Sequence, residues 1–326
     1  MVSKTGTRRV RGLAALAAIA VVTVTATSAC AGSSSSSAKL SSSASASAGG
    51  GNPLAPSASN TVVVGSANFP EDELLAEIYV LALQAKGVKV TSKLNIGARE
   101  VYYPQVEKGA ISIIPEYNGT LLSVEVDPKS PAKTTTAVDA ALAAGLPSSL
   151  EVLNPASAQD SDSVTVTAAT AAKYHLKSIA DLKPYASKLS IGGPPEFKTR
   201  VDGLVGLKST YGLTFKSFVP LDESGPITLA ALQDGKVQAA DVFTTTPQII
   251  SDHLVSLTDP KFNFAAQNVI PLVYKPALTP TIASVLNAIS AKLTTSALLQ
   301  MDNAIITQHA NYSTVAAGFL KAEGLS

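Results

Sequence analysis

The sequence predicts an α/β fold whose globular part consists of two lobes. Stretches rich in β-branched residues alternate with stretches of helical spacing, a rhythm typical of parallel strands joined by crossover helices, and this alternation occurs twice. One plan also recurs: at 106–116 and at 232–241 a helix ends at a glycine and the next strand ends at a carboxylate. We therefore interpret these two segments as equivalent units, one in each lobe.

Residues 1–29 have the pattern of a secretion signal, with basic residues, an apolar run over 13–24 and then small residues. The only cysteine, Cys30, follows Thr-Ser-Ala, which resembles a lipobox. We expect lipidation of Cys30 and anchoring to the outer face of the cell membrane. An ordinary signal peptide with an incidental cysteine is the alternative, and Thr7-Arg8-Arg9 leaves twin-arginine export open beside Sec export.

The chain after the signal divides by composition. Residues 30–59 contain Cys30 and then mostly Ser, Ala and Gly, which cannot bury enough apolar surface to fold, so we expect a flexible linker. We assign residues 60–162 plus 267–326 to lobe 1 and residues 163–266 to lobe 2.

Lobe 1 begins with a β-branched strand over 61–65. A helix follows from Pro70, a residue favoured in the first turn, and ends at Gly87. The next predicted elements are a strand over 88–94, a helix over 100–108 and a strand over 110–114. We expect one of Tyr102 and Tyr103 to be buried and the other to be free to line a cleft.

Lobe 2 repeats this order of elements. The pattern predicts strands over 163–167, 189–192 and 214–218, a partly helical segment over 173–182 and a helix over 200–211. The chain then offers a strand over 269–273 and helices over 281–293, 296–308 and 313–320, which we expect to pack on lobe 1.

The sequence lacks the residues that several classes of function require. The formal net charge of +1 provides no basic field for nucleic acid. His175, His253 and His309 have no partners at metal-ligand spacing, and no nucleotide-binding or nucleophile-elbow motif is present. We expect no cofactor, no metal and no catalysis.

Glu116 and Asp241 are predicted to lie at the carboxyl ends of strands, where open α/β sheets bind ligands. Capping of helix N-termini is an equal alternative for both. An acid/base pair formed by these two carboxylates would instead indicate an extracytoplasmic hydrolase. A binding domain that serves a sensor or an adhesin is a third alternative.

Blocks along both lobes resemble the osmoprotectant-binding proteins of glycine betaine, carnitine and choline ABC importers. The resemblance runs in family order from Thr61 to about Gln308, and its blocks are Gly65–Glu71, Ile96–Glu100, Pro115–Thr120, Ala172–Leu182, Pro195–Leu213 and Asp241–Thr246. It implies a type II periplasmic-binding fold, with two lobes, two crossover strands and a central ligand cleft. It also implies that the protein is a monomer, that it binds a quaternary-ammonium solute and that it docks on the membrane subunits of a permease.

The resemblance further implies a set of ligand-binding residues. Family members surround a trimethylammonium group with aromatic rings, because a quaternary ammonium cannot donate hydrogen bonds. Tyr117 and Phe243 match rings of this cage, and Thr120 matches a nearby hydrogen-bonding threonine. Arg200 matches the arginine that binds the ligand carboxylate, and Asp160 matches an acidic cleft residue.

Arg200 also stands out by composition, because the only other arginine after residue 59 is Arg99, which we expect to be structural. The planar fork of an arginine suits a carboxylate, and an ion pair with Asp202 or Glu196 is the alternative for Arg200.

Four positions depart from the family pattern. Ala67 stands where some members have a lysine, Asp162 where a cage tyrosine is common, and Gln267 with Asn268 where another tyrosine is usual. Polar groups at these positions suit a more polar solute than glycine betaine, because unpaired buried polar groups are costly. Choline, carnitine, ergothioneine, a polyol or an aromatic metabolite therefore remain alternatives for the same importer role.

Overall fold

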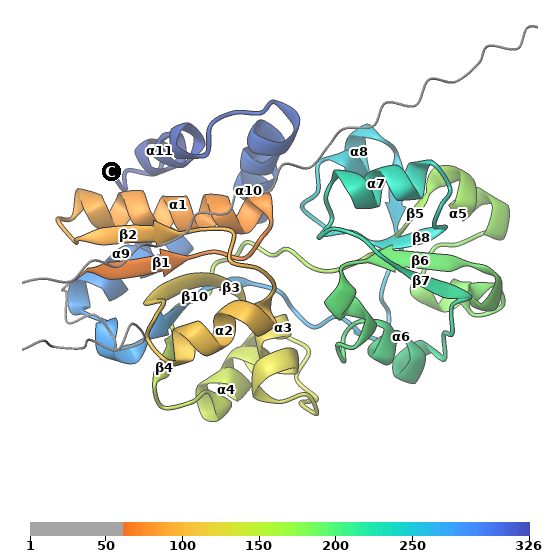
Figure 1. Cartoon of the computed structure of the whole chain (residues 1–326), viewed down its shortest axis with the longest axis horizontal. Coiled ribbons are helices and arrows are strands. Elements are labelled where there is room, and N and C mark those ends of the chain that lie inside the picture. The colour runs from red at the N-terminus through yellow and green to blue at the C-terminus, as the bar shows by residue number, and fades with distance from the viewer. Residues whose placement is uncertain (1–60) are drawn as a thin grey trace, which may run out of the picture. The chain divides into compact units, whose positions relative to one another are not determined.

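Two five-stranded sheets, one in each lobe, organise residues 61–326, the part of the chain that a computed structural model describes (Figure 1). The predicted signal, Cys30 and the linker lie outside these described residues. The strand order is β2-β1-β3-β10-β4 in lobe 1 and β7-β6-β8-β5-β9 in lobe 2. The strands of lobe 1 are β1 (Val62–Gly65), β2 (Val90–Lys93), β3 (Ile113–Tyr117), β4 (Leu150–Val152) and β10 (Val269–Tyr274). Those of lobe 2 are β5 (Val164–Thr167), β6 (Ser190–Gly193), β7 (Ser217–Pro220), β8 (Ala239–Asp241) and β9 (Leu254–Ser256).

The two recurring sequence units occupy equivalent places, which confirms that interpretation. Strands β3 and β8 each form the centre of a sheet, parallel to one neighbour and antiparallel to the other. The expectation of parallel strands holds for only part of each sheet, because β10 and β5 enter from the opposite lobe and run antiparallel to both of their neighbours.

Helices cover both faces of the sheets. Lobe 1 contains α1 (Pro70–Ala85), α2 (Arg99–Glu107), α3 (Asn118–Thr120), a π-helical turn (Leu121–Val126), α4 (Thr135–Gly145), α9 (Pro280–Ser290), α10 (Thr295–Asp302), a second π-helical turn (Asn303–Thr307) and α11 (Tyr312–Ala322). Lobe 2 contains α5 (Ala168–Tyr174), α6 (Leu204–Tyr211), α7 (Pro226–Gln233) and α8 (Gln248–Ser251). Helix α11 lies along α1, so the helical tail packs on lobe 1 as expected (Figure 1).

Some predicted bounds were wrong. The strand predicted over 110–114 begins only at Ile113, because the N–H groups of Ala110 and Ile111 close a turn on the carbonyl of Gln105. The segment 173–182 is not one helix, since α5 ends where His175 adopts a left-handed φ of 55° and a short 3₁₀ turn (Ile179–Leu182) follows. The helix predicted from Arg200 begins at Leu204.

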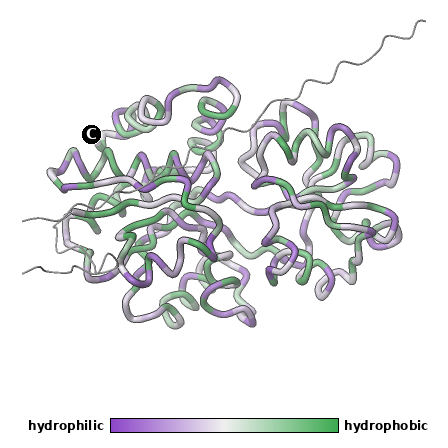
Figure 2. Tube along the Cα trace, viewed as in Figure 1, coloured by the Kyte–Doolittle hydropathy of each residue, from purple (hydrophilic) through white to green (hydrophobic). Residues whose placement is uncertain are grey.

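Each lobe has its own core. Strand β3 is buried throughout and packs with α1 in one cluster in lobe 1, whereas lobe 2 holds two smaller clusters. Figure 2 shows hydrophobic residues along the inner strands of both sheets. Within residues 61–326, no single helix is long and apolar enough to span a membrane, and α9 with α10 and its π-helical turn passes only as a pair bent by 86°.

Two crossover segments join the lobes, as expected for the type II fold. Gln159 on the first segment and Asn268 on the second form an isolated antiparallel bridge, and the N–H of Asp160 donates to the carbonyl of Gln267 at 3.1 Å. The two chain crossings therefore run side by side, which brings Asp160 and Gln267 together at the junction of the lobes.

Candidate functional site

One cavity collects side chains from both lobes and both crossover segments. Eight of the nine predicted ligand-binding residues line it: Ala67, Tyr117, Thr120, Asp160, Asp162, Arg200, Phe243 and Gln267. Seven further residues complete the lining: Phe69, Ala98, Arg99, Tyr102, Pro194, Glu196 and Glu223. Residues distant in sequence thus meet at one site.

Asn268, the ninth predicted residue, lies outside this lining. Its side-chain amide donates to the carbonyl of Ala156 at 2.8 Å, and its side-chain oxygen accepts from the Thr135 hydroxyl at 2.7 Å. Its backbone N–H donates to the side-chain oxygen of Asn118 at 2.8 Å. The polar groups of Asn268 therefore tie the second crossover segment to lobe 1.

Three aromatic rings form one wall of the cavity. The Phe69 ring lies 6.0 Å from that of Tyr117 and meets that of Phe243 edge-on at 5.2 Å between centroids. Glu71 accepts a hydrogen bond from the Tyr117 hydroxyl and so fixes that ring. Phe69 was missed by the sequence reasoning, although it lies in a family block at the point where β1 gives way to α1. The signal was an aromatic side chain just after the carboxyl end of a strand.

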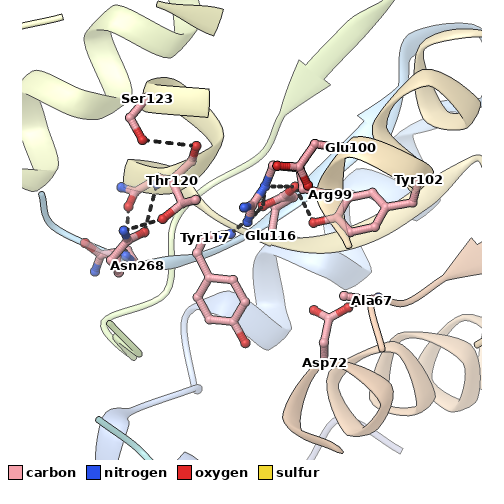
Figure 3. Close-up of polar contacts among 12 residues, drawn as sticks. Ala67, Asp72, Arg99, Glu100, Tyr102, Glu116, Tyr117, Thr120, Ser123 and Asn268 are labelled. Carbon is pink, nitrogen blue, oxygen red and sulfur yellow. Dashed lines mark hydrogen bonds and ion pairs between the residues drawn. The ribbon is translucent and has the colours of Figure 1, made fainter. Parts of the chain in front are cut away.

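A buried ion pair supports the cavity from lobe 1. The Arg99 guanidinium donates to Glu116 at 2.8 and 2.9 Å, and Glu116 also accepts from the Tyr102 hydroxyl at 2.7 Å (Figure 3). Arg99 is thus structural, as expected, while also lining the cavity. Tyr102 and Tyr103 are both buried, so neither is exposed, but Tyr102 lines the cavity and Tyr103 does not, as expected for one of the two.

Neither carboxylate of the hydrolase alternative lines the cavity. Glu116 is fully buried with its charge matched by Arg99, so a solute contact was the wrong alternative, while its carboxylate accepts from the N–H of Tyr117, the N-cap residue of α3, at 2.9 Å. Asp241 is buried beside Asp162, and this burial raises its pKa well above the ordinary value. An acid/base pair needs both groups to face the substrate, which this arrangement does not provide.

Arg200 makes an ion pair with the opposite lobe. Its guanidinium donates to both carboxylate oxygens of Glu100 at 2.9 Å, so the predicted alternatives, Asp202 and Glu196, were wrong. Burial alone would raise the pKa of Glu100, but the hydrogen bonds and charge of Arg200 hold it below the ordinary value. Asp202 instead accepts from the Ser123 hydroxyl at 2.8 Å, a second contact between lobes.

Four carboxyl groups, those of Asp160, Asp162, Glu196 and Glu223, give the cavity an acidic character. Burial, with the charge of Asp202, raises the pKa of Asp162 to about 6, and burial beside Glu196 raises that of Glu223 to about 8. Burial and the charge of Glu71 raise the pKa of Asp160 well above the ordinary value. A bound cation would stabilise the ionised form of each group.

Two polar residues of the cavity are partly satisfied within the protein: Gln267, which stands where a family tyrosine is usual, and Asp160, which matches an acidic cleft residue. Gln267 accepts from the Thr120 N–H at 2.9 Å and donates to the Thr120 hydroxyl at 2.6 Å. Asp160 accepts from the Thr245 N–H at 3.0 Å and the Thr244 hydroxyl at 3.1 Å. These hydrogen bonds pair groups that a solute would otherwise have to pair. The reason for expecting a more polar ligand than glycine betaine is therefore weaker.

The cavity is small, with a volume of about 50 Å³. An apolar cavity that accepts benzene measures about 150 Å³, so a solute with a trimethylammonium group needs more room than this arrangement gives. Among residues 61–326, no group of three or more His, Cys, Asp or Glu side chains could hold a metal ion.

Two α/β lobes around a cavity at paired crossover segments define a type II solute-binding protein. The chain belongs to the family described as the substrate binding domain of ABC-type glycine betaine transport systems, whose model matches residues 60–322. It is therefore the extracytoplasmic substrate-binding component of an ABC importer of this family.

Individual relatives are distant but cover the same region. The glycine betaine-binding protein YehZ of Escherichia coli (strain K12) is 28% identical over 280 residues, which cover 82% of this chain and 92% of that protein. The ergothioneine transport permease/ergothioneine binding protein EgtU of Helicobacter pylori (strain G27) is 23% identical over 275 residues, which cover 81% of this chain and 48% of that protein. A crystal structure of a glycine betaine/carnitine/choline ABC transporter matches with a TM-score of 0.63 and 22% identity, covering 81% of this chain and 99% of that chain.

Proposed function

We propose that this chain captures a small quaternary-ammonium solute of the betaine type in the cavity between its lobes and delivers it to the permease, without catalysing a reaction. The observation that carries the proposal is the meeting of three aromatic rings and four carboxyl groups around one cavity that also holds Arg200. The similarity to the glycine betaine-binding protein YehZ supports the same class of solute.

The cationic group of the solute lies against the wall formed by Phe69, Tyr117 and Phe243. A desolvated cation–π contact stabilises binding by about 2 kcal/mol, and no hydrogen-bond donor on the cation is needed. The carboxyl groups of the cavity strengthen this preference for positive charge. A solute carboxylate, where present, takes the place of Glu100 on the Arg200 guanidinium.

Binding requires the lobes to move. The cavity of about 50 Å³ must widen to admit the solute, and this requires contacts between the lobes to break, among them the polar contacts of Arg200 with Glu100 and of Ser123 with Asp202. The solute shifts the hinge equilibrium only by its difference in affinity for the two states. The widened state admits the solute, and the closed state retains it for delivery.

We propose further that the protein is attached to the membrane and acts alone. Lipidation of Cys30 anchors the protein, and residues 30–59 act as the linker between the anchor and the lobes. The protein works as a monomer.

Calorimetric titration tests the proposal. Choline is compared with 3,3-dimethylbutan-1-ol, a neutral molecule of nearly the same shape, because only choline carries the charge that the rings recognise. We expect choline to bind about 30-fold more tightly, the factor that corresponds to a cation–π contribution of about 2 kcal/mol. Tyr117→Leu should remove most of this difference, whereas Tyr185→Leu, which changes a tyrosine of lobe 2 outside the cavity, should not.

A panel of glycine betaine, carnitine and ergothioneine identifies the solute within the class. Equal binding of choline and its neutral analogue would contradict the proposal. Binding of polyols alone would mean that the importer role is kept for a different class of solute.

A further inference from the structure

A second and larger cavity adjoins the first and shares two rings of its aromatic wall. It measures about 540 Å³ and shares Phe69, Phe243 and Glu223 with the first cavity. Its lining comes from α7 and the loop after β8 in lobe 2, and from the start of α1 and the region from Asp302 to Tyr312 in lobe 1. This volume lies within the range of about 300–1,000 Å³ that is typical of small-molecule sites.

Apolar side chains form much of this second cavity, with Leu229 from lobe 2 facing Ile305 and Ile306 from lobe 1. Together with the edges of Phe69 and Phe243, they offer space for an aliphatic or aromatic body. Such a surface alone would bind many apolar molecules, so any selectivity depends on the polar groups in the lining.

Two buried carboxyl groups supply that selectivity. Asp302 is 1% exposed and neither of its oxygens has a hydrogen-bond partner, and Glu71 is 3% exposed with Oε2 unpartnered. The other oxygen of Glu71 accepts from the Tyr117 hydroxyl. The two carboxyl groups are neighbours, and burial raises the pKa of both. A shared proton and the Thr245 hydroxyl, which lines the same cavity, can pair only some of the lone pairs on these oxygens, so acceptor capacity remains for a donor from outside.

We propose that the second cavity binds an organic ammonium ion that carries N–H donors on an apolar body, with Asp302 and Glu71 accepting its N–H groups. This ligand class differs from that of the first cavity, because a quaternary ammonium has no N–H to donate. The proposal does not rest on the solute assigned to the first cavity. The donors of the ligand pair the buried acceptors, and its body covers the apolar lining.

The test uses three molecules that share one phenylethyl body. 2-Phenylethylamine carries an ammonium with donors, its N,N,N-trimethyl derivative carries the charge without donors, and 2-phenylethanol is uncharged. In calorimetric titrations at pH 7.5 we expect the amine to bind at least about tenfold more tightly than either analogue, since hydrogen bonds to charged groups are the strong ones.

Asp302→Asn should weaken binding of the amine by at least about tenfold, because it removes the charged acceptor while keeping the shape. Asp234→Asn changes a surface carboxylate and is the matched control, which should leave the affinity unchanged. Ile306→Trp fills the cavity without touching the carboxyl groups and should abolish binding. An amine that binds no better than 2-phenylethanol, or that binds equally to Asp302→Asn, overturns the proposal.

Titration of the unmodified chain with choline, beside the titrations with 2-phenylethylamine, separates this proposal from the proposed function. If the unmodified chain binds choline but not the amine, only the proposal of a ligand site in the second cavity is overturned. Amine binding that depends on Asp302, with no choline binding, supports the second cavity and contradicts the proposed function alone.

Discussion

Replacement of Glu100 by glutamine should raise the affinity for glycine betaine relative to that for choline. In the structure the Arg200 guanidinium is held by both oxygens of Glu100, at 2.9 Å each. A ligand carboxylate that binds Arg200 must first displace Glu100, whereas choline has no carboxylate and makes no such exchange. The neutral amide of glutamine competes less well for the guanidinium.

The size of the effect follows from the exposure of the pair. The side chain of Arg200 is 14% exposed, but that of Glu100 is 44% exposed, so solvent screens the attraction. We therefore assign the pair about 1 kcal/mol, the upper end for surface ion pairs, which corresponds to about fivefold in the dissociation constant. Loss of this contact between the lobes also shifts the hinge equilibrium, but that shift affects both ligands equally.

The assay is the ratio of the dissociation constants for glycine betaine and choline, measured by calorimetry in the unmodified chain, in Glu100→Gln and in Arg200→Ala. We expect the ratio to fall about fivefold in Glu100→Gln and to rise in Arg200→Ala, and the double variant should resemble Arg200→Ala. An unchanged ratio in Glu100→Gln would refute the exchange of Glu100 for a ligand carboxylate. A fall in the affinity for both ligands by the same factor would assign the ion pair to lobe closure alone.

Three further predictions concern pH and stability. Affinity for choline should rise by about tenfold between pH 5 and 9 as Asp162, with a pKa of about 6, and Glu223, with a pKa of about 8, ionise, and a flat calorimetric profile would contradict this. Asp302→Asn should raise the free energy of unfolding at pH 8 by up to about 4 kcal/mol and leave it unchanged at pH 4, as followed by urea titration. The reason is that the pKa of Asp302 is raised to about 7 in the folded protein, so the stability that this group contributes below pH 4 is lost as the pH rises through 7. Gly119→Ala should lower the urea midpoint, at a cost of about 1–3 kcal/mol, because its Cβ would lie 2.3 Å from the carbonyl oxygen of Ala266, whereas Gly318→Ala, with nothing within 4 Å, should not.

Local patterns predicted much of the fold because each element carries its own signal. The apolar run of β3 and the proline at the start of α1 determine structure within a few residues. The position of Tyr117 at the end of β3 also indicated the cleft, but the family blocks were needed to assign Tyr117, Thr120 and Arg200, all of which line the cavity. The antiparallel strands β4 and β9 were missed because each is only three residues long and shows no clear alternation.

Contacts between distant segments could not be predicted from these patterns. Arg200 pairs with Glu100 rather than with its sequence neighbours Glu196 and Asp202, because the meeting of the two lobes decides the partner. The same holds for the ring contact of Phe69 with Phe243, which depends on the crossover segments. Asn268 was predicted to bind ligand because of its position in the family pattern, but its side chain pairs instead with Thr135 of α4.

The acidic lining of the cleft links recognition to stability. Asp162, Glu223 and Asp302 all have raised pKa values because burial disfavours their charged forms, so each lowers the free energy of unfolding as it ionises. A protein selected for stability alone would replace them with neutral residues. A bound cation offsets this cost by compensating the buried charge, so the free energy that destabilises the empty protein becomes affinity for a positively charged solute. The stabilisation given by a cationic ligand should therefore increase with pH, while that given by a neutral ligand of the same shape should not.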